Sequence, residues 1–358
     1  MKHALFCCAV ACAALAAQLH ADEATPPAAA ERDGSHDFDF NLGVWKTHIV
    51  RQAHPLSNSN ETIKIDGVVH VRPVWNGRAQ VEEIEADGPH GHWEGLTLFT
   101  YNPVAHQWVQ TFLNSQSGRF GGDSLMGAFH DGRAELFATD TVDGRAVLVR
   151  GTWSGITPTA HRYEEAYSTD GGKTWEVEFT GDLTKASEAD LPTVSNTDGS
   201  HEFDFDFGTW KTHSSRLMHP LTGASDWRDM DGLTVVTPLW GGRANLAEFK
   251  GTGPAGTVEL IALRVYNPTT KQWSINFTHP GTGLWGDAPG IGEFKNGRVD
   301  FYDQEPINGK AVLVRFSMWG ITKDTAQSEQ AFSTDGGKTW EVNWVNKYTR
   351  APEKPAGG

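Results

Sequence analysis

The sequence predicts an all-β fold of two tandem antiparallel β-barrels with about eight to ten strands each. Three observations lead to this prediction. The chain repeats itself once, each repeat alternates apolar with polar residues at a period of two, and turn-forming residues separate the alternating segments. The length of 358 residues fits about two domains, and 39 Gly and 17 Pro supply many turns.

The internal repeat has a constant offset of 165 residues. The segment 45–48, with the sequence WKTH, recurs at 210–213, and the segment 168–176, with the sequence STDGGKTWE, recurs at 333–341. The two copies extend over residues 34–185 and 199–350. Residues 186–198 are polar and contain a proline, so we expect a linker there, and we expect a disordered tail at 351–358.

Alternating segments within each copy predict strands joined as hairpins. Trp108, Gln110 and Phe112 share one side of such a segment, and the intervening residues take the other side. Turn-forming pairs lie between these segments at 66–67, 76–77, 102–103, 131–132, 143–144 and 170–171. Many short antiparallel strands favour a sandwich or a closed barrel, and a barrel of this size has room for one small ligand.

The first 21 residues predict a cleavable secretory signal, because a short basic start precedes an apolar run that ends in small residues. Cleavage is expected after Ala21, with Ala16 or Ala17 as the alternative, and lipid attachment at Cys12 is a less favoured reading. All three cysteines lie inside this segment. The mature protein is therefore expected in the periplasm or outside the cell, without disulfides or cysteine-ligated metals.

Charge and motif content exclude several classes of function. A net charge of −15 with no basic cluster disfavours nucleic acid as a partner, and no apolar run of about 18 residues remains to span a membrane. The repeated histidines lack the close spacing of a metal site, and no nucleotide-binding or hydrolase motif occurs. We predict no metal, no cofactor and a small-molecule partner; the oligomeric state stays open.

The copies resemble a known family at both ends. The segment 38–45, with the sequence FDFNLGVW, is similar to the opening of lipocalin-like (calycin) barrels, in which a Gly-x-Trp on the first strand plugs one end. With the Asn-Pro at 102–103, the Gln-Trp at 107–108 and the closing STDGGKTW, each copy resembles an uncharacterised family of secreted bacterial proteins with lipocalin-like barrels. The resemblance implies the fold and no particular activity.

Two further resemblances are weaker. The closing segment 168–175 is similar to the Asp-box of sialidase propellers, but it occurs once per copy rather than once per blade, so we interpret it as a structural turn. The segment 42–45 is similar to the start of haem-binding barrels, which use a histidine late in the domain. Only His161 is placed for that role, and Ala326 replaces it in the second copy, so no haem is predicted.

Arg150 with Glu164, repeated as Arg315 with Glu329, is the candidate catalytic pair. A hairpin turn at 155–159 would place the arginine opposite the glutamate, and an Arg–carboxylate pair inside a barrel could orient a polar group or a catalytic carboxylate. The alternative is a structural ion pair across two strands.

Candidate ligand-binding residues are polar or aromatic positions on otherwise apolar strand faces, together with a position at which the two copies differ. They are Glu83, Glu94, Glu248, Glu259, Trp108, Trp273, Asn114 and His279. The sequence thus predicts a secreted or periplasmic protein that binds a small, largely apolar molecule inside a barrel. An enzyme, such as a lyase, isomerase or cyclase that uses an interior Glu–Arg pair, is the alternative, and the sequence does not decide between them.

Overall fold

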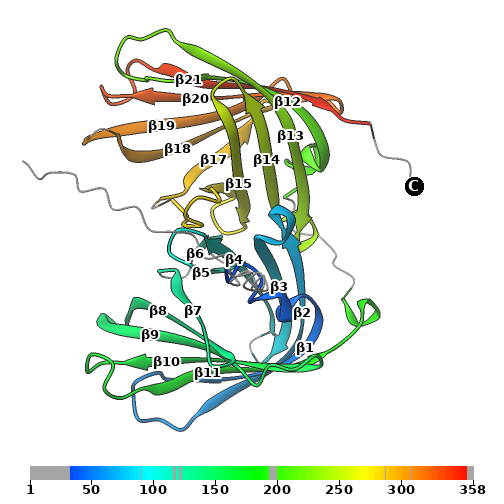
Figure 1. The fold of residues 1–358 in the computed structure, drawn as a ribbon, viewed down its shortest axis with the longest axis vertical. Coiled ribbons are helices and arrows are strands. Elements are labelled where there is room, and N and C mark those ends of the chain that lie inside the picture. The colour runs from blue at the N-terminus through cyan, green and yellow to red at the C-terminus, as the bar shows by residue number, and fades with distance from the viewer. Residues whose placement is uncertain are drawn as a thin grey trace, which may run out of the picture. The chain divides into compact units, whose positions relative to one another are not determined.

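The computed structural model of the chain describes residues 33–89, 91–115, 118–120, 123–192, 200–286, 288–307 and 309–352. These residues belong to one compact unit that begins at Asp33. They form two closed antiparallel barrels of ten strands each, one from each repeat, which confirms the predicted fold class (Figure 1). The predicted signal segment, the second half of the predicted linker and most of the predicted tail lie outside the described residues.

Barrel 1 is a meander in which β1 pairs with β11, and the pairing of β4 with β5 closes the sheet. The two-residue strand β6 pairs antiparallel with the end of β5. Its strands are β1 (Gly43–Gln52), β2 (Thr62–Val74), β3 (Ala79–Gly88), β4 (Gly91–Asn102), β5 (Gln107–Asn114), β6 (Arg119–Phe120), β7 (Leu125–His130), β8 (Arg133–Val142), β9 (Arg145–Ser154), β10 (Ala160–Ser168) and β11 (Glu176–Lys185). Short 3-10 turns occur as η1 (Asp39–Asn41), η2 (Trp75–Gly77) and η3 (Glu188–Asp190).

Barrel 2 repeats this meander, and the pairing of β12 with β21 closes it. Its strands are β12 (Gly208–Leu217), β13 (Trp227–Leu239), β14 (Ala244–Gly253), β15 (Gly256–Asn267), β16 (Gln272–Thr278), β17 (Gly290–Lys295), β18 (Arg298–Ile307), β19 (Lys310–Trp319), β20 (Thr325–Ser333) and β21 (Glu341–Arg350). The 3-10 turns are η4 (Asp204–Asp206) and η5 (Trp240–Gly242). No helix in the described part of the chain is long and apolar enough to cross a membrane.

A buried tryptophan on the first strand closes one end of each barrel. In barrel 2 the Trp210 indole donates to the carbonyl of Asp206 at 2.7 Å, and the Arg350 guanidinium lies 3.7 Å from the centre of the Trp210 ring. Trp45 and Lys185 make the equivalent contact in barrel 1 at 4.0 Å. A cation over an indole face is favourable when partly desolvated, so the first and last strands hold this end shut.

The closing STDGGKTW segment forms a hydrogen-bonded turn in both barrels. In barrel 2, Asp335 Oδ1 accepts the amides of Lys338 and Thr339, each at 3.0 Å, and Oδ2 accepts the hydroxyl of Thr339 at 2.7 Å. Ser333 Oγ donates to Asp335 at 2.8 Å. These bonds lower the pKa of Asp335 to about 2, the amide of Thr339 contributing most. They agree with a structural role for the segment.

Asp335→Ala is expected to lower the Tm by a few degrees, because four donors in the turn lose their acceptor. Asp335→Asn keeps an oxygen acceptor and should have a smaller effect. Thermal unfolding followed by circular dichroism measures both. Equal Tm values for Asp335→Ala and the unmodified protein would contradict this role.

The two barrels pack together through equivalent outer faces, called here the inter-barrel face. Strands β3 and β4 meet β14 and β15 in one buried apolar cluster. From barrel 1 it contains Ala79, Val81, Leu96 and Leu98, and from barrel 2 their counterparts Ala244, Leu246, Ile261 and Leu263. Each of these strands therefore has one face toward the lumen of its own barrel and a largely apolar face toward the other barrel.

Candidate functional site

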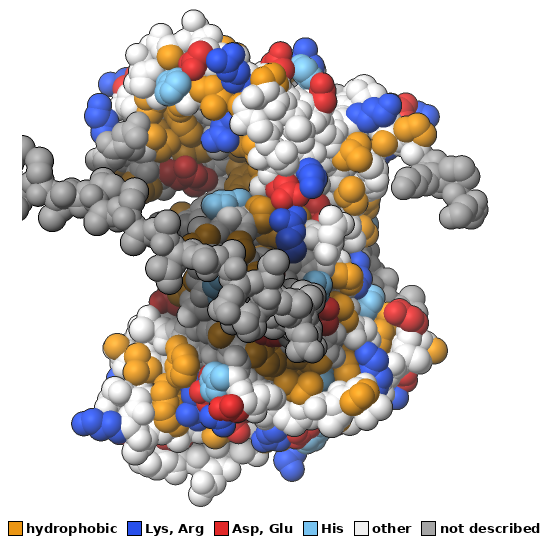
Figure 2. Space-filling view, viewed as in Figure 1, with side chains coloured by type: hydrophobic (Ala, Val, Ile, Leu, Met, Phe, Trp, Pro, Cys, Tyr) orange, Lys and Arg blue, Asp and Glu red, His pale blue; other side chains and the backbone are white. Residues whose placement is uncertain are grey.

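The lumen of barrel 2 contains a cavity of about 800 Å³ that is open to solvent at one side. Hydrophobic side chains gather over this barrel in the upper part of Figure 2, where the surface is hollowed. Strand alternation explains the lining, since Ala262 and Arg264 on β15, and Ile275 and Phe277 on β16, point to the same side. Further apolar lining comes from Ala247, Phe249, Leu260, Phe316, Phe332 and Trp344.

A buried ion pair lies at the end of the cavity next to η4. Arg264 Nη1 donates to Asp206 Oδ2 at 2.6 Å and to Asn245 Oδ1 at 3.0 Å. Both charged side chains are only 6% exposed, and the guanidinium lies 4.7 Å from the centre of the Phe203 ring. Arg264 itself lines the cavity. This end of the lumen is therefore polar, whereas the walls are apolar.

Three neutral polar groups extend this polar end. The hydroxyls of Tyr348 and Ser328 lie 2.9 Å apart, and Asn346 Nδ2 donates to Ser328 Oγ at 3.0 Å. Burial raises the pKa of Tyr348 to about 12, so it remains a neutral hydrogen-bonding group. Tyr348 and Asn346 both line the cavity.

Acidic residues lie on the lumen side of β18, two residues apart. Glu305 lines the cavity, and Asp303 shares its strand face. Burial, and then the neighbouring Glu305, raise the pKa of Asp303 to about 7. Burial also raises the pKa of Glu305. Arg216, another lining residue, lies over the Trp344 ring at 4.7 Å.

The interior of barrel 1 carries different chemistry. Both Tyr163 and Tyr167 donate their hydroxyls to the carboxylate of Glu165, each at 3.1 Å. Burial raises the pKa of Glu165, and these two hydrogen bonds oppose the shift. The positions equivalent to these three residues in barrel 2 are Ser328, Gln330 and Phe332. The lumens of the two repeats thus differ in charge and polarity.

His161 is the second unusual group inside barrel 1. It is 3% exposed, and neither ring nitrogen has a hydrogen-bond partner among the described residues. Its ring packs against Trp45 at 4.3 Å and Phe40 at 5.1 Å between centroids. Burial lowers the pKa of His161 to about 4, and Lys185 adds to the shift, so the ring is neutral at pH 7. Among the described residues no group of three potential ligands is placed to hold a metal ion.

The candidate catalytic pairs lie on the outer faces of the barrel strands. In barrel 2, Phe316 and Gln330 line the cavity, so alternation directs their neighbours Arg315 and Glu329 outward. Arg315 Nη2 donates to Glu329 Oε1 at 3.1 Å, and its guanidinium lies 4.7 Å from the centre of the Trp340 ring. Arg315 and Glu329, the pair named in the alternative enzyme hypothesis, therefore do not line this cavity.

The expected register of these pairs is wrong by two residues. The loop at 155–159 is as predicted, but Arg150 lies opposite Ala166, and Glu164 lies opposite Thr152. The arginine and glutamate are therefore diagonal neighbours instead of direct partners. In barrel 1 the Arg150 guanidinium lies over the Trp175 ring at 4.6 Å, and the described residues show no ion pair between it and Glu164.

The four candidate ligand-binding glutamates lie on the inter-barrel face. Glu248 Oε2 accepts the amide of Trp75 at 2.7 Å, and in the mirrored contact Glu83 Oε1 accepts the amide of Trp240 at 2.9 Å. These faces looked like lumen faces in the sequence because they are apolar. They are apolar because the other barrel covers them.

The other two glutamates bind arginines of the opposite barrel. Arg78 Nη2 donates to Glu259 Oε2 at 3.0 Å, and Arg243 donates to Glu94. The Glu94 side chain is 6% exposed, whereas Arg78 in the mirrored pair is 42% exposed. Glu259 also lines the barrel 2 cavity, so among these four glutamates it alone contacts both the inter-barrel face and the cavity.

The remaining candidate ligand-binding residues lie in the core, at a strand end and in the cavity wall. Trp108 and Trp273 are each 1% exposed, and their indoles donate to Gly34 and Glu202. Asn114 ends β5 and lies opposite Gly95. His279 lines the barrel 2 cavity.

Sequence reasoning missed Arg264 and Asp206, although a signal was present. Their counterparts in the first copy are Phe99 and Asn41, so both positions carry a charge in the second copy alone. Two opposite charges that occur together in one copy and are absent from the other indicate a contact.

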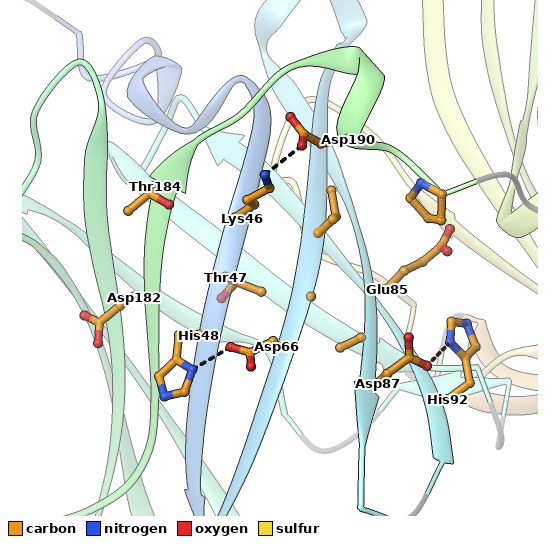
Figure 3. Close-up of a pocket in the computed structure, with 14 residues that line it drawn as sticks. Lys46, Thr47, His48, Asp66, Glu85, Asp87, His92, Asp182, Thr184 and Asp190 are labelled. Atoms are coloured by element: carbon orange, nitrogen blue, oxygen red, sulfur yellow. Dashed lines mark hydrogen bonds and ion pairs between the residues drawn. The ribbon is translucent and has the colours of Figure 1, made fainter.

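A second, outer groove of about 590 Å³ lies over β1, β2 and β3 (Figure 3). Lys46 forms an ion pair with Asp190 at 2.7 Å, and His48 and Asp66 lie 2.6 Å apart. Figure 3 also shows His92 turned toward Asp87, at 3.1 Å. Three of the lining acids, Asp66, Asp87 and Asp190, thus have partners within the groove, and exposed pairs of this kind contribute little to stability.

Comparison with known proteins adds no family. No family model matches the sequence, and no curated protein matches it. Among solved structures the chain is similar to an S-type phycobiliprotein lyase from Guillardia theta, at 12% identity over 46% of this chain and 100% of that one, with a TM-score of 0.31.

Two other solved structures show similarity at comparable levels. A protein of unknown function from the DUF3598 family of Nostoc punctiforme is 10% identical over 89% of this chain and 99% of that one, with a TM-score of 0.24. A mutant transferrin-binding protein B from Haemophilus parasuis is 7% identical over 86% of this chain and 76% of that one, with a TM-score of 0.20. Similarity at this level defines neither a family nor a function. The fold and the cavity define the chain as an all-β protein of two tandem closed barrels.

Proposed function

We propose that this chain is a secreted, periplasmic protein that binds a small, largely apolar molecule in the cavity of barrel 2. The observation that carries the proposal is the open cavity of about 800 Å³ with largely apolar walls in the lumen of barrel 2. Ligand pockets are typically about 300–1,000 Å³, mostly apolar, with a few convergent polar groups. The lipocalin-like opening and the predicted signal segment support the same function and location.

The cavity wall supports an apolar ligand body. Phe277, Phe316 and Phe332 supply aromatic surface, and Ala247 and Ala262 leave room where larger residues would fill the lumen. The apolar area that a ligand would bury here contributes about 25 cal/mol per Å² before the costs of association. Trp344 also lines the cavity, so ligand binding should alter its fluorescence.

Titration with an uncharged lipophilic dye, N-phenyl-1-naphthylamine, tests the proposal. The full mature chain should bind one dye per molecule and quench its tryptophan fluorescence. Ala262→Phe, which fills the cavity, should weaken binding by about tenfold or more. Val235→Phe adds the same ring on the exposed outer face of β13 in the same barrel and should bind as the unmodified protein does.

Extraction identifies the natural ligand. Protein purified from its native host is treated with a mild organic solvent, and the extract is analysed by mass spectrometry. Absence of dye binding together with an empty extract would refute the proposed function. Equal dye affinity of Ala262→Phe and the unmodified protein would place the binding outside barrel 2.

A further inference from the structure

We propose that Arg264 holds the inner end of the bound molecule, and that this end is an uncharged hydrogen-bond acceptor such as a ketone or ester carbonyl. This inference rests on the proposed function, because it concerns the same cavity. It adds the chemical class of the ligand: an apolar body with a neutral carbonyl at the end that enters first.

The first argument is the number of donors at the polar end. A guanidinium has five N–H groups, and Nη1 of Arg264 uses its two on Asp206 and Asn245. Nε of Arg264 is buried with no hydrogen-bond partner among the described residues, and so is Nδ2 of Asn245. Arg264 lines the cavity, so a ligand oxygen at this end can accept a hydrogen bond from the N–H groups that the guanidinium does not use on Asp206 and Asn245.

The second argument is charge. Asp206 already neutralises Arg264 within a pair whose side chains are 6% exposed. A ligand carboxylate would place a second negative charge beside Asp206 in surroundings of low dielectric, where like charges repel strongly and desolvation is expensive. A neutral carbonyl accepts the same N–H groups without adding charge. The cavity therefore favours a carbonyl over a carboxylate.

The third argument comes from the first repeat. Phe99 stands where barrel 2 has Arg264, and Asn41 stands where it has Asp206. Phe99 is fully buried in the core of barrel 1, so the fold closes its lumen end without an ion pair. A buried pair is weak evidence for stability, since apolar residues of similar size often serve as well. The pair is present at these positions in barrel 2 alone, where Arg264 lines the cavity, and this placement supports a role toward a ligand.

The test uses the full mature chain and displacement of N-phenyl-1-naphthylamine by three probes of equal chain length: an n-alkane, a methyl ketone and a fatty acid. At pH 7 the ketone should bind about 10- to 100-fold more tightly than the alkane, the range expected of a hydrogen bond to a charged donor. The ketone should also bind more tightly than the fatty acid.

Two variants separate the contributions. Asp206→Asn removes the competing charge and should shift the preference toward the fatty acid. The double variant Arg264→Met with Asp206→Asn replaces the pair with uncharged groups, leaves no unpaired charge, and should bind ketone and alkane alike. It should keep the alkane affinity, which shows that the cavity is intact.

The outcomes distinguish the two proposals. If dye and alkane bind but the ketone has no advantage, or the fatty acid binds best to the unmodified protein, the inference about Arg264 is wrong and the proposed function stands. If neither dye nor alkane binds, the proposed function fails. Should either variant be unfolded by circular dichroism, the order of the three probes on the unmodified protein alone decides.

Discussion

Replacement of Glu94 by alanine is expected to reduce the free energy of unfolding by about 3 kcal/mol. Glu94 accepts a hydrogen bond from Arg243 across that face, and its side chain is 6% exposed. The alanine variant removes this carboxylate while the arginine stays in place. Loss of one member of a buried pair costs far more than the pair contributes.

The repeat supplies a matched control for this prediction. Glu259→Ala removes the acceptor of Arg78 in the mirrored pair, whose arginine is 42% exposed. Water can replace the lost carboxylate there, so a loss of about 1 kcal/mol or less is expected. Urea unfolding of both variants, with the double variants Glu94→Ala/Arg243→Ala and Glu259→Ala/Arg78→Ala, measures the two coupling energies. Equal losses for the two glutamates would contradict the burial argument.

His161 is expected to make the protein less stable as the pH falls from about 6.5 to about 4. Burial lowers the pKa of His161 from 6.5 to about 4, so in this range the unfolded chain takes up a proton that the folded protein does not. The full contribution is present above pH 6.5 and is lost on acidification. Over the whole range the difference amounts to about 3 kcal/mol, at 1.36 kcal/mol per pKa unit.

His161→Leu removes the titrating ring and should flatten this part of the stability profile. The leucine also fits the apolar surroundings formed by Phe40 and Trp45. Urea midpoints at several pH values between 4 and 7 measure the slope. His201→Leu, at an exposed loop position, should leave the slope as it is in the unmodified protein. A steep slope that persists in His161→Leu would assign the acid sensitivity to another group.

The sequence predicted the fold well because its signals are local and occur twice. Alternation, turn pairs and the constant offset each specify strands and hairpins without knowledge of their partners. The loop at 155–159 shows which features these local signals predict and which they do not. Its position was predicted, yet the register of β9 and β10 differed by two residues, because pairing depends on the hydrogen bonds that the loop makes, such as the one from the Thr157 amide to the Ala160 carbonyl.

The site was harder to predict, for a reason that Glu83 and Glu94 illustrate. An apolar strand face indicates burial but does not say what buries it. Here the second barrel covers that face, and alternation then sends the opposite face, with Arg264 and Ala262, into the lumen. Only the packing of the two repeats tells inside from outside, and packing is not a periodic property of the sequence. Positions at which the two copies carry different residue types indicate the cavity better than apolar strand faces do.

The mirrored contacts on the inter-barrel face have a consequence for how such a protein acquires new specificity. Each repeat carries both halves of each contact, so the face is self-complementary, as in a two-fold homodimer. In a homodimer every mutation alters both lumens at once. Covalent fusion of the two copies removes that constraint, so one lumen can gain a charge pair while the other keeps a phenylalanine. In a duplicated chain with such a face, the two interiors can therefore change independently while the mirrored contacts between the barrels are kept.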